Sequence, residues 1–292
     1  MALATKEASL ILFLLLVLSF FFVNRSNSAT DSFVFGGCSQ LKYTSGSPYD
    51  SNVNSILTSL VNSAMYTSYS NFTVPAAGAA SQDTVYGLFQ CRGNLNGGDC
   101  SRCVARAVSQ LGTLCLDSTG GALQLEGCFV KYDNTSFLGV EDKTVVAKKC
   151  GPMTSSTYSD ELTRRDAVLG YLGSSDGTYR PFRVGGSGDL QGVAQCVGDL
   201  SPSECQDCLS AAIGQLKTEC AGAKWGDMYL AKCYVRYSEG GNHSHGQNDT
   251  NDDDDEIEKT LAILIGLIAG VALLILFVSF LSKLCENGKG GK

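Results

Sequence analysis

The feature that most constrains this chain is a set of cysteine spacings that occurs twice. Five cysteines recur further along the chain, each displaced by the same 105 residues (196 − 91). The first set is Cys91, Cys100, Cys103, Cys115 and Cys128, and the second is Cys196, Cys205, Cys208, Cys220 and Cys233. Cys38 and Cys150 precede the two sets, so each copy has six cysteines. A repeat of this kind indicates one structural unit built twice.

Twelve of the thirteen cysteines lie between two apolar runs, one near each end of the chain. An even number of cysteines at patterned spacings in an exported region indicates disulfides, and spacing alone leaves fifteen pairings for each six-cysteine copy. Each closed loop typically stabilises a small domain by about 2 to 4 kcal/mol. The disulfides therefore explain the stability of the domains and do not indicate a catalytic activity.

The N-terminal residues 1–28 are predicted to be a signal peptide. Lys6 and Glu7 precede an apolar run at 10–23, and small polar residues follow at 24–30. This run is short for a bilayer span of roughly 20 residues, so cleavage is expected after Ser28 or Ala29. An uncleaved anchor is the alternative, and the exported character of the following sequence argues against it.

The second apolar run, 261–281, contains no charged residue and is predicted to be a transmembrane helix. An acidic segment at 252–256 precedes it, and Lys283, Lys289 and Lys292 follow. This asymmetry places the C-terminus in the cytosol, which is a type I topology. The short tail is too small for an intracellular catalytic domain.

These features divide the chain into six expected segments. They are the signal peptide (1–28), a first domain (29–140), a second domain (141–241), an acidic extracellular stalk (242–260), the membrane span (261–281) and a cytosolic tail (282–292).

Each domain is expected to have an α+β fold. Apolar residues spaced by three and four predict a helix over 53–65, with Ser51 as its N-cap, and a second helix that begins near Asp99. The second copy repeats the latter pattern over 205–216. Segments 84–91 and 122–132, rich in β-branched and aromatic residues, predict antiparallel strands. Each domain should therefore be one antiparallel sheet packed by two helices.

Little in the sequence indicates catalysis or a cofactor. The pairs Cys100/Cys103 and Cys205/Cys208 could serve as redox motifs or zinc half-sites. A zinc site would need its thiolates kept reduced, and a redox motif would not need four additional patterned cysteines beside it. The only histidines, His243 and His245, lie in the stalk, so neither domain has a visible general base. No enzyme, catalytic residue, cofactor or metal is expected. The net charge of −7 argues against a nucleic-acid partner.

Several residues are candidates for modification or membrane packing. Glycosylation sequons begin at Asn71, Asn134, Asn242 and Asn248. Cys285 follows the span and is a candidate for S-acylation. Gly266 and Gly270 form a G-x-x-x-G pair that predicts close packing of two spans. The acidic run at 252–256 lacks the turn glycine of a calcium loop, which favours a solvated spacer.

The repeated spacing C-x8-C-x2-C resembles the plant stress-antifungal domain typified by ginkbilobin and used in cysteine-rich receptor-like kinases. Two such domains followed by one span and a minimal tail are similar, over the whole chain, to the plasmodesmata-located protein family. The resemblance implies the disulfides Cys38 to Cys115, Cys91 to Cys100, Cys103 to Cys128, Cys150 to Cys220, Cys196 to Cys205 and Cys208 to Cys233.

Ginkbilobin-type domains can bind mannose through an Asn, an Arg and a Glu at fixed distances from the cysteines. The corresponding residues here are Ser39, Ala122 and Asp133 in the first copy, and Gly151, Asp227 and Ser238 in the second. Without the arginine, a sugar hydroxyl pair loses its bidentate donor. Mannose binding in that mode is therefore not expected, which leaves another glycan-binding surface open.

The resemblance implies a non-enzymatic plasma-membrane protein at plasmodesmata, with its ectodomain in the apoplast and its targeting information in the span. It implies control of cell-to-cell movement through callose deposition and a part in plant defence. Related family members, viral movement proteins and receptor kinases are the implied partners. The alternative is a cell-surface co-receptor for a glycan or other ligand that acts through a partner kinase. An antifungal lectin is a third interpretation, disfavoured by the missing triad and the anchor.

Overall fold

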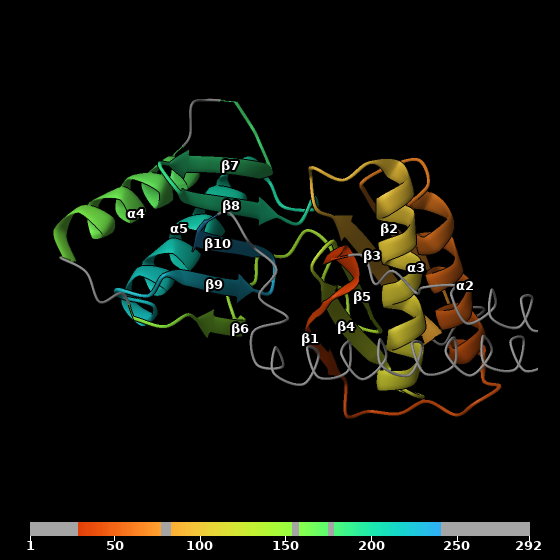
Figure 1. The fold of residues 1–292 in the computed structure, drawn as a ribbon. Coiled ribbons are helices and arrows are strands. Elements are labelled where there is room, and N and C mark those ends of the chain that lie inside the picture. Colours follow the sequence, from red (N-terminus) through yellow and green to blue (C-terminus); the bar gives the residue numbers. More distant parts are fainter. Residues whose placement is uncertain (1–28, 77–82, 154–157, 175–177, 241–292) are drawn as a thin grey trace, which may run out of the picture. The chain divides into compact units, whose positions relative to one another are not determined.

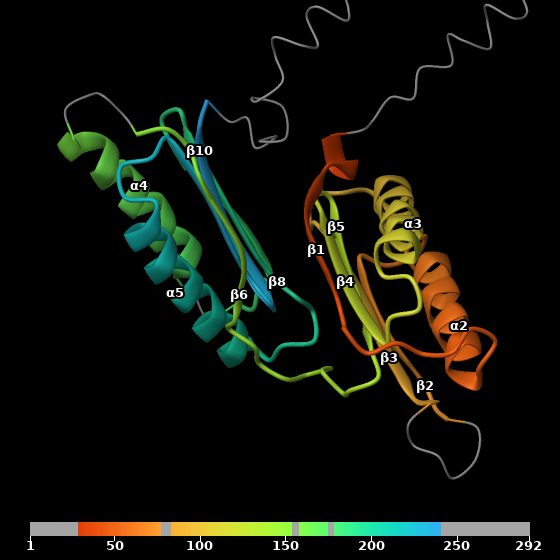
Figure 2. The same ribbon diagram turned by 90° about the horizontal axis from the view of Figure 1, so that it is seen from below.

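The computed structural model describes residues 29–76, 83–153, 158–174 and 178–240. These residues form two domains of the same topology, each with two helices against one face of a five-stranded sheet (Figures 1 and 2). Both domains belong to one compact unit of the chain. The predicted α+β class with two helices per sheet is confirmed.

The first domain begins with a short 3-10 turn, η1 (Ala29–Asp31). Its elements are β1 (Phe33–Cys38), α2 (Pro48–Ser63), β2 (Tyr69–Val74), β3 (Val85–Cys91), α3 (Gly97–Leu114), β4 (Gly120–Leu125) and β5 (Cys128–Asp133). The strand order is β1-β4-β5-β3-β2, and every neighbouring pair is antiparallel. Strands β1 and β2 are therefore the two edges of the sheet.

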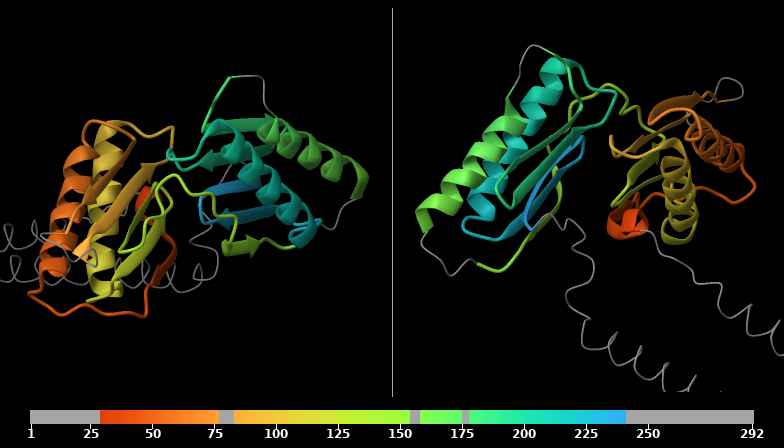
Figure 3. Two further views of the ribbon diagram at one scale, coloured as in Figure 1. Left: turned by 180° about the vertical axis from the view of Figure 1, so that it is seen from behind. Right: turned by 45° about the horizontal axis from the view of Figure 1, so that its top comes forward.

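The second domain repeats this order of elements (Figure 3). They are β6 (Val145–Cys150), α4 (Tyr158–Gly173), β7 (Phe182–Ser187), β8 (Leu190–Cys196), α5 (Pro202–Glu219), β9 (Trp225–Leu230) and β10 (Cys233–Glu239). Its strand order, β6-β9-β10-β8-β7, is that of the first sheet. Residues that are equivalent in the repeat therefore occupy equivalent places in the two sheets.

The helix starts correct one expectation and refine another. The N-cap of α2 is Ser47, whose side chain accepts from the Asp50 amide and which precedes Pro48, a residue favoured in the first turn. Ser51, the predicted cap, lies inside the helix, because the proline starts the helix earlier than the apolar pattern indicates. Helix α3 begins at Gly97 behind the N-cap Asn96, two positions before the predicted start.

The segment 122–132 forms a hairpin of two strands, β4 and β5, and does not continue as one strand. The turn lies at Glu126 and Gly127, where a Cβ on the glycine would meet Thr30 at 2.8 Å. An apolar run of this length cannot by itself show where a tight turn divides it. The turn also brings the Glu126 side chain to the end of the sheet, where it contacts the second domain.

The helix-covered face of each sheet holds the core of that domain. Ile56 and Leu60 of α2 and Leu111 of α3 pack against Phe89 and Val130 of the first sheet. The core of the second domain is built in the same way and contains Leu169, Leu209 and Leu216. The two cores are separate, so the residues that link the domains lie outside both cores.

Six disulfides join the helices to the sheets, with the same pairings that the family resemblance implies. They are Cys38–Cys115, Cys91–Cys100, Cys103–Cys128, Cys150–Cys220, Cys196–Cys205 and Cys208–Cys233. Four of these bridges are buried at both ends. In the other two, Cys38 and Cys150 lie exposed on the edge strands β1 and β6.

Within the described ranges, none of the helices is both long and apolar enough to cross a bilayer. The predicted span, 261–281, lies outside those ranges.

Candidate functional site

The open faces of the two sheets contact each other through a row of aromatic and amide side chains. The Phe35 ring lies 6.2 Å from Phe129 in its own domain and 5.7 Å from Tyr229 of the second domain. Tyr229 in turn stacks beside Tyr234, with ring centroids 5.1 Å apart. Aromatic pairs at these distances add to the area that they bury. The aromatic row therefore joins the domains through side chains that face away from both cores.

Two reciprocal contacts at this interface follow the repeat. A Cβ on Gly93 would meet the Phe182 side chain of the second domain at 2.5 Å. A Cβ on Gly198, the equivalent of Gly93, would meet the Tyr69 ring of the first domain at 2.7 Å. Such a self-complementary pattern is typical of a two-fold interface between identical subunits. The tandem thus packs its two copies as a dimer would, with both glycines allowing close approach.

Amide hydrogen bonds extend this interface. Gln195 Nε2 donates to the Cys91 carbonyl at 2.9 Å, and the Gly198 amide donates to Gln90 Oε1 at 3.0 Å. Tyr234 donates its hydroxyl to Gln195 Oε1 at 3.1 Å, and burial raises the pKa of this tyrosine to about 12. The tyrosine is therefore a neutral donor at any physiological pH. A small cavity of about 30 Å³ beside these residues has room for a water molecule.

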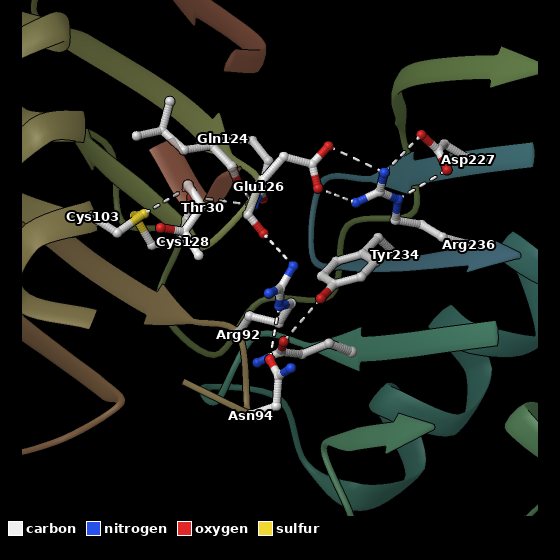
Figure 4. A network of polar contacts seen from close by, with 12 residues as sticks. Thr30, Arg92, Asn94, Cys103, Gln124, Glu126, Cys128, Asp227, Tyr234 and Arg236 are labelled. Carbon is white, nitrogen blue, oxygen red and sulfur yellow. Dashed lines mark hydrogen bonds and ion pairs between the residues drawn. A yellow bond between two sulfur atoms is a disulfide. The ribbon is translucent and has the colours of Figure 1, made fainter. Parts of the chain in front are cut away.

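The largest electrostatic feature of the interface is a buried arginine between two carboxylates (Figure 4). Arg236 of β10 donates to Asp227 Oδ1 from Nε at 2.9 Å and to Oδ2 from Nη2 at 3.2 Å. Its Nη2 also donates to Glu126 Oε1 of the first domain at 3.1 Å, and its Nη1 donates to Glu126 Oε2. The three side chains are only 4 to 9 % exposed. Bidentate pairing on both sides fixes the arginine plane.

A second buried cation anchors the linker between the domains. Lys232 Nζ donates to the Phe137 carbonyl at 2.9 Å and forms an ion pair with Asp199. Asp199 Oδ2 also accepts from the Gly139 amide at 2.9 Å. Phe137 packs with Leu88 and Val197 in a small apolar cluster that includes residues of both domains. The linker is therefore part of the packed interface.

A cleft of about 500 Å³ lies on the part of the first sheet that the interface leaves open. Its floor is formed by residues 36–38 of β1 and 120–122 of β4, where glycines have no side chain to cover the backbone. Lys131, Asp133 and Ser39 supply the polar side chains, and Val146 of β6 adds an apolar contact from the second domain. A flat backbone floor beside a cation and a carboxylate suits a small polar ligand.

The equivalent place in the second domain is filled by side chains. Trp225 takes the place of Gly120, and its ring lies so close to Gly151 that a Cβ there would meet it at 2.4 Å. Asp227 takes the place of Ala122 and is engaged by Arg236. The two copies thus share a fold but differ in the side chains that occupy this place.

The structure shows where the three residues at the family's mannose-binding positions lie. In the first copy Ser39, Ala122 and Asp133 all line the open cleft. In the second copy Asp227 belongs to the buried ion pair, and Gly151 lies under Trp225. The arginine of that mode is absent from both copies.

The C-x-x-C pairs do not form redox or zinc sites. Cys100 is bonded to Cys91 and Cys103 to Cys128, so neighbouring cysteines of the motif belong to different bridges. Cys205 and Cys208 repeat this pattern. In the part of the chain that the structure describes, no group of acidic, histidine or cysteine side chains could hold a metal ion.

Two predicted glycosylation sites lie within the described residues. Asn71 is exposed on the edge strand β2, and its amide donates to the Tyr69 hydroxyl at 2.7 Å. Asn134 is half-buried in the turn after β5. Asn242, Asn248, Gly266, Gly270 and Cys285 lie outside the described residues.

Sequence reasoning did not identify the domain interface. Arg236 and Glu126 lie 110 residues apart, and neither forms part of a recognisable motif. One signal was available, because Lys131 and Arg236 occupy equivalent positions beside Ala122 and Asp227. Only the second copy has a carboxylate, Asp227, opposite this cation, and that difference indicates an ion pair in the second copy alone.

Comparison with known proteins agrees with this architecture. A family model described as salt stress response/antifungal matches residues 37–135 and 148–240, one match for each copy. The chain is 61 % identical to plasmodesmata-located protein 6 of Arabidopsis thaliana over 273 residues, which cover 91 % of this chain and 93 % of the relative. The chain belongs to the plasmodesmata-located protein family.

Other members of this family extend the match to solved structures. Plasmodesmata-located protein 7 of the same plant is 62 % identical over 220 residues, 75 % of this chain and 72 % of the relative. The crystal structure of the tandem DUF26 ectodomain of the Arabidopsis thaliana receptor-like protein PDLP5 matches with a TM-score of 0.68 at 50 % identity. It covers 72 % of this chain and all of that ectodomain. The tandem is therefore an arrangement that the family shares.

Proposed function

We propose that this protein is a single-pass membrane protein of plasmodesmata that regulates movement between cells, without enzymatic activity of its own. The observation that carries the proposal is the match to plasmodesmata-located protein 6 over 91 % of the chain. That match extends beyond the two cysteine-rich domains, which end near residue 240. It therefore supports shared membrane anchoring and location as well as a shared ectodomain fold.

In this proposal residues 1–28 direct export, 261–281 cross the plasma membrane, and the tandem domains face the apoplast. The ectodomain acts by recruiting partners that deposit callose around the channel, and the span carries the targeting information. Oligomers with related family members, receptor kinases and docked viral movement proteins are the proposed partners. Gly266 and Gly270 are proposed as a packing face of the span, and Cys285 as an acylation site.

The proposal predicts paired puncta across the wall when a C-terminal fluorescent fusion is imaged in leaf epidermis. The puncta should coincide with a callose stain, because the protein is proposed to act where callose is deposited. Replacement of 261–281 by an unrelated span should disperse the signal over the plasma membrane. The unchanged ectodomain provides the control for folding and export in both fusions.

Uniform plasma-membrane signal from the intact fusion would contradict the proposal. The surface co-receptor would then be the better account, and the open cleft of the first domain is the observation that favours it. Puncta that persist after the span is replaced would leave the location intact and assign targeting to the ectodomain.

A further inference from the structure

The two copies provide an internal comparison for the cation in the open cleft. Lys131 and Arg236 each lie three residues after the cysteine that opens the last strand of their sheet. Lys131 faces Ala122 across the β4–β5 pair, and Arg236 faces Asp227 across the β9–β10 pair. The second copy therefore shows which group the first copy lacks at this position.

In the second copy the cation has two carboxylate partners, Asp227 and Glu126. In the first copy Lys131 Nζ has neither a hydrogen bond nor an ion pair with any residue in the described ranges. Its recorded contact is with the Phe137 ring, whose centroid lies 4.4 Å away. The half-buried ammonium has thus lost part of its hydration, and the aromatic ring replaces it less well than a carboxylate would.

The electrostatics of Lys131 agree with this geometry. Burial lowers the pKa of Lys131, and the carboxylate of Asp133 acts in the opposite direction. The ammonium of Lys232 lowers it further, whereas the carboxylates of Asp142 and Asp199 raise it. The local carboxylates therefore do not offset the desolvation of the ammonium. An anion placed beside Lys131 would supply the missing interaction.

The remaining surface of the cleft suits hydroxyl groups. Asp133 Oδ1 accepts from the Thr135 amide at 2.9 Å, and its carboxylate lines the cleft. Ser39 Oγ accepts from the Thr119 hydroxyl at 3.1 Å and also lines the cleft. A Cβ on Gly37 would meet nothing within 4 Å, so the floor above β1 is unobstructed.

We propose that the cleft of the first domain binds a carboxylate flanked by hydroxyl groups, which pairs with Lys131 in the place that Asp227 fills in the second domain. This chemistry is that of a hydroxy acid, either free or as a uronate residue of an acidic polysaccharide. The site uses Lys131 and not the absent arginine of the mannose-binding mode. It requires only an exposed ectodomain and is independent of where in the membrane the protein resides.

Titration calorimetry of the full chain in detergent micelles tests this site. The probes are α-1,4-linked trigalacturonate, its fully methyl-esterified form, free galacturonate and a tetra-aspartate peptide. We expect trigalacturonate to bind and its ester to bind at least tenfold more weakly, because the ester keeps the hydroxyls and loses the charge. Equal binding by free galacturonate identifies a free hydroxy acid as the source, whereas trimer-only binding identifies the polysaccharide.

Three variants assign the binding to the cleft. Lys131→Met should weaken trigalacturonate binding roughly tenfold or more, and Lys131→Arg should retain it because the charge remains. Ala122→Asp should also abolish binding, since it installs the carboxylate that the second copy already has. Lys217→Met is the matched control, because Lys217 lies on α5 outside the cleft and should leave binding unchanged.

The proposal is overturned if no sugar acid binds the wild-type chain, or if the methyl ester binds as well as the acid. Full binding by both Lys131→Met and Ala122→Asp would also overturn it. Binding by the aspartate peptide alone would assign the cleft to a polypeptide and contradict the hydroxy-acid chemistry. None of these results bears on the puncta in epidermis, so the two proposals fail separately.

Discussion

Replacing Arg236 by methionine should lower the free energy of unfolding of the ectodomain by about 3 to 5 kcal/mol. The substitution leaves Glu126 and Asp227 buried without the cation that each of them pairs with. An uncompensated buried carboxylate costs far more than an exposed one, because it cannot regain its hydration. In a unit of this size the loss corresponds to a fall in Tm of roughly 10 °C.

Urea unfolding with the disulfides intact measures this loss. The chain has a single tryptophan, Trp225 on β9, so its fluorescence reports on the second domain next to the arginine. Arg106→Met is the matched control, since Arg106 is 42 % exposed and its Nε lies 3.9 Å from Asp31. That control should cost less than about 1 kcal/mol.

A triple variant separates charge from packing. Arg236→Met combined with Glu126→Gln and Asp227→Asn removes all three charges and keeps the side-chain volumes similar, so most of the lost stability should return. If Arg236→Met destabilises no more than Arg106→Met, the interface does not rest on this ion pair.

The second large effect is expected on limited reduction by a dithiol. The bridges Cys38–Cys115 and Cys150–Cys220 should open first, because Cys38 and Cys150 are exposed whereas the other four bridges are buried at both ends. These two bridges also close the longest loops, with sequence separations of 77 and 70. In the chain-entropy model each such loop contributes about 4 kcal/mol to stability.

Stepwise reduction, alkylation and peptide mass spectrometry identify the order of opening. The chain with Cys38 and Cys115 both changed to serine is the reference for the equilibrium effect, and it should lose about 4 kcal/mol of unfolding free energy. The matched control changes Cys91 and Cys100, whose separation of 9 predicts a loss smaller by about 1 to 2 kcal/mol from loop entropy alone. Alkylation that appears first at Cys103 or Cys208 would contradict the assignment.

The repeat in the sequence predicted that both copies share one α+β fold, because the cysteines restrict each copy in the same way. Once Cys91 and Cys196 occupy equivalent positions, the flanking strands and helices must be equivalent as well. The sequence also predicted which helix faces are buried, since Cys100, Val104 and Leu111 share one face of α3. The predicted N-cap of α2, Ser51, was wrong because the helix begins at Pro48, before the first residue of the apolar pattern.

The candidate site could not be predicted in the same way. The residues at the mannose-binding positions predicted that mannose does not bind in the family's mode. The structure shows that these residues, Ser39, Ala122 and Asp133, nevertheless line one open cleft. In the second copy the equivalent place is occupied because Trp225 lies over Gly151 and Arg236 reaches Glu126. Contacts between residues so distant along the chain depend on how the domains pack, and no local pattern encodes that packing.

The exposed location of two bridges was equally hidden in the sequence. The residues beside a cysteine do not show whether its strand lies at an edge, and the edge position of β1 becomes apparent only once the strand order is known. Cys38 then lies at the outer strand whereas Cys91 lies on β3, between two neighbours. The strand order therefore determines which bridges a reductant can reach.

The measurement that tests the account most directly is the spread of a freely diffusing fluorescent protein from single transformed epidermal cells. Cells that also produce this chain should pass the tracer to fewer neighbours than cells that produce the chain with 261–281 replaced. Coexpression of a callose-degrading glucanase should restore the spread, because the effect is proposed to act through callose. Equal spread with and without the intact chain, at matched protein levels, would contradict a role in regulating movement between cells.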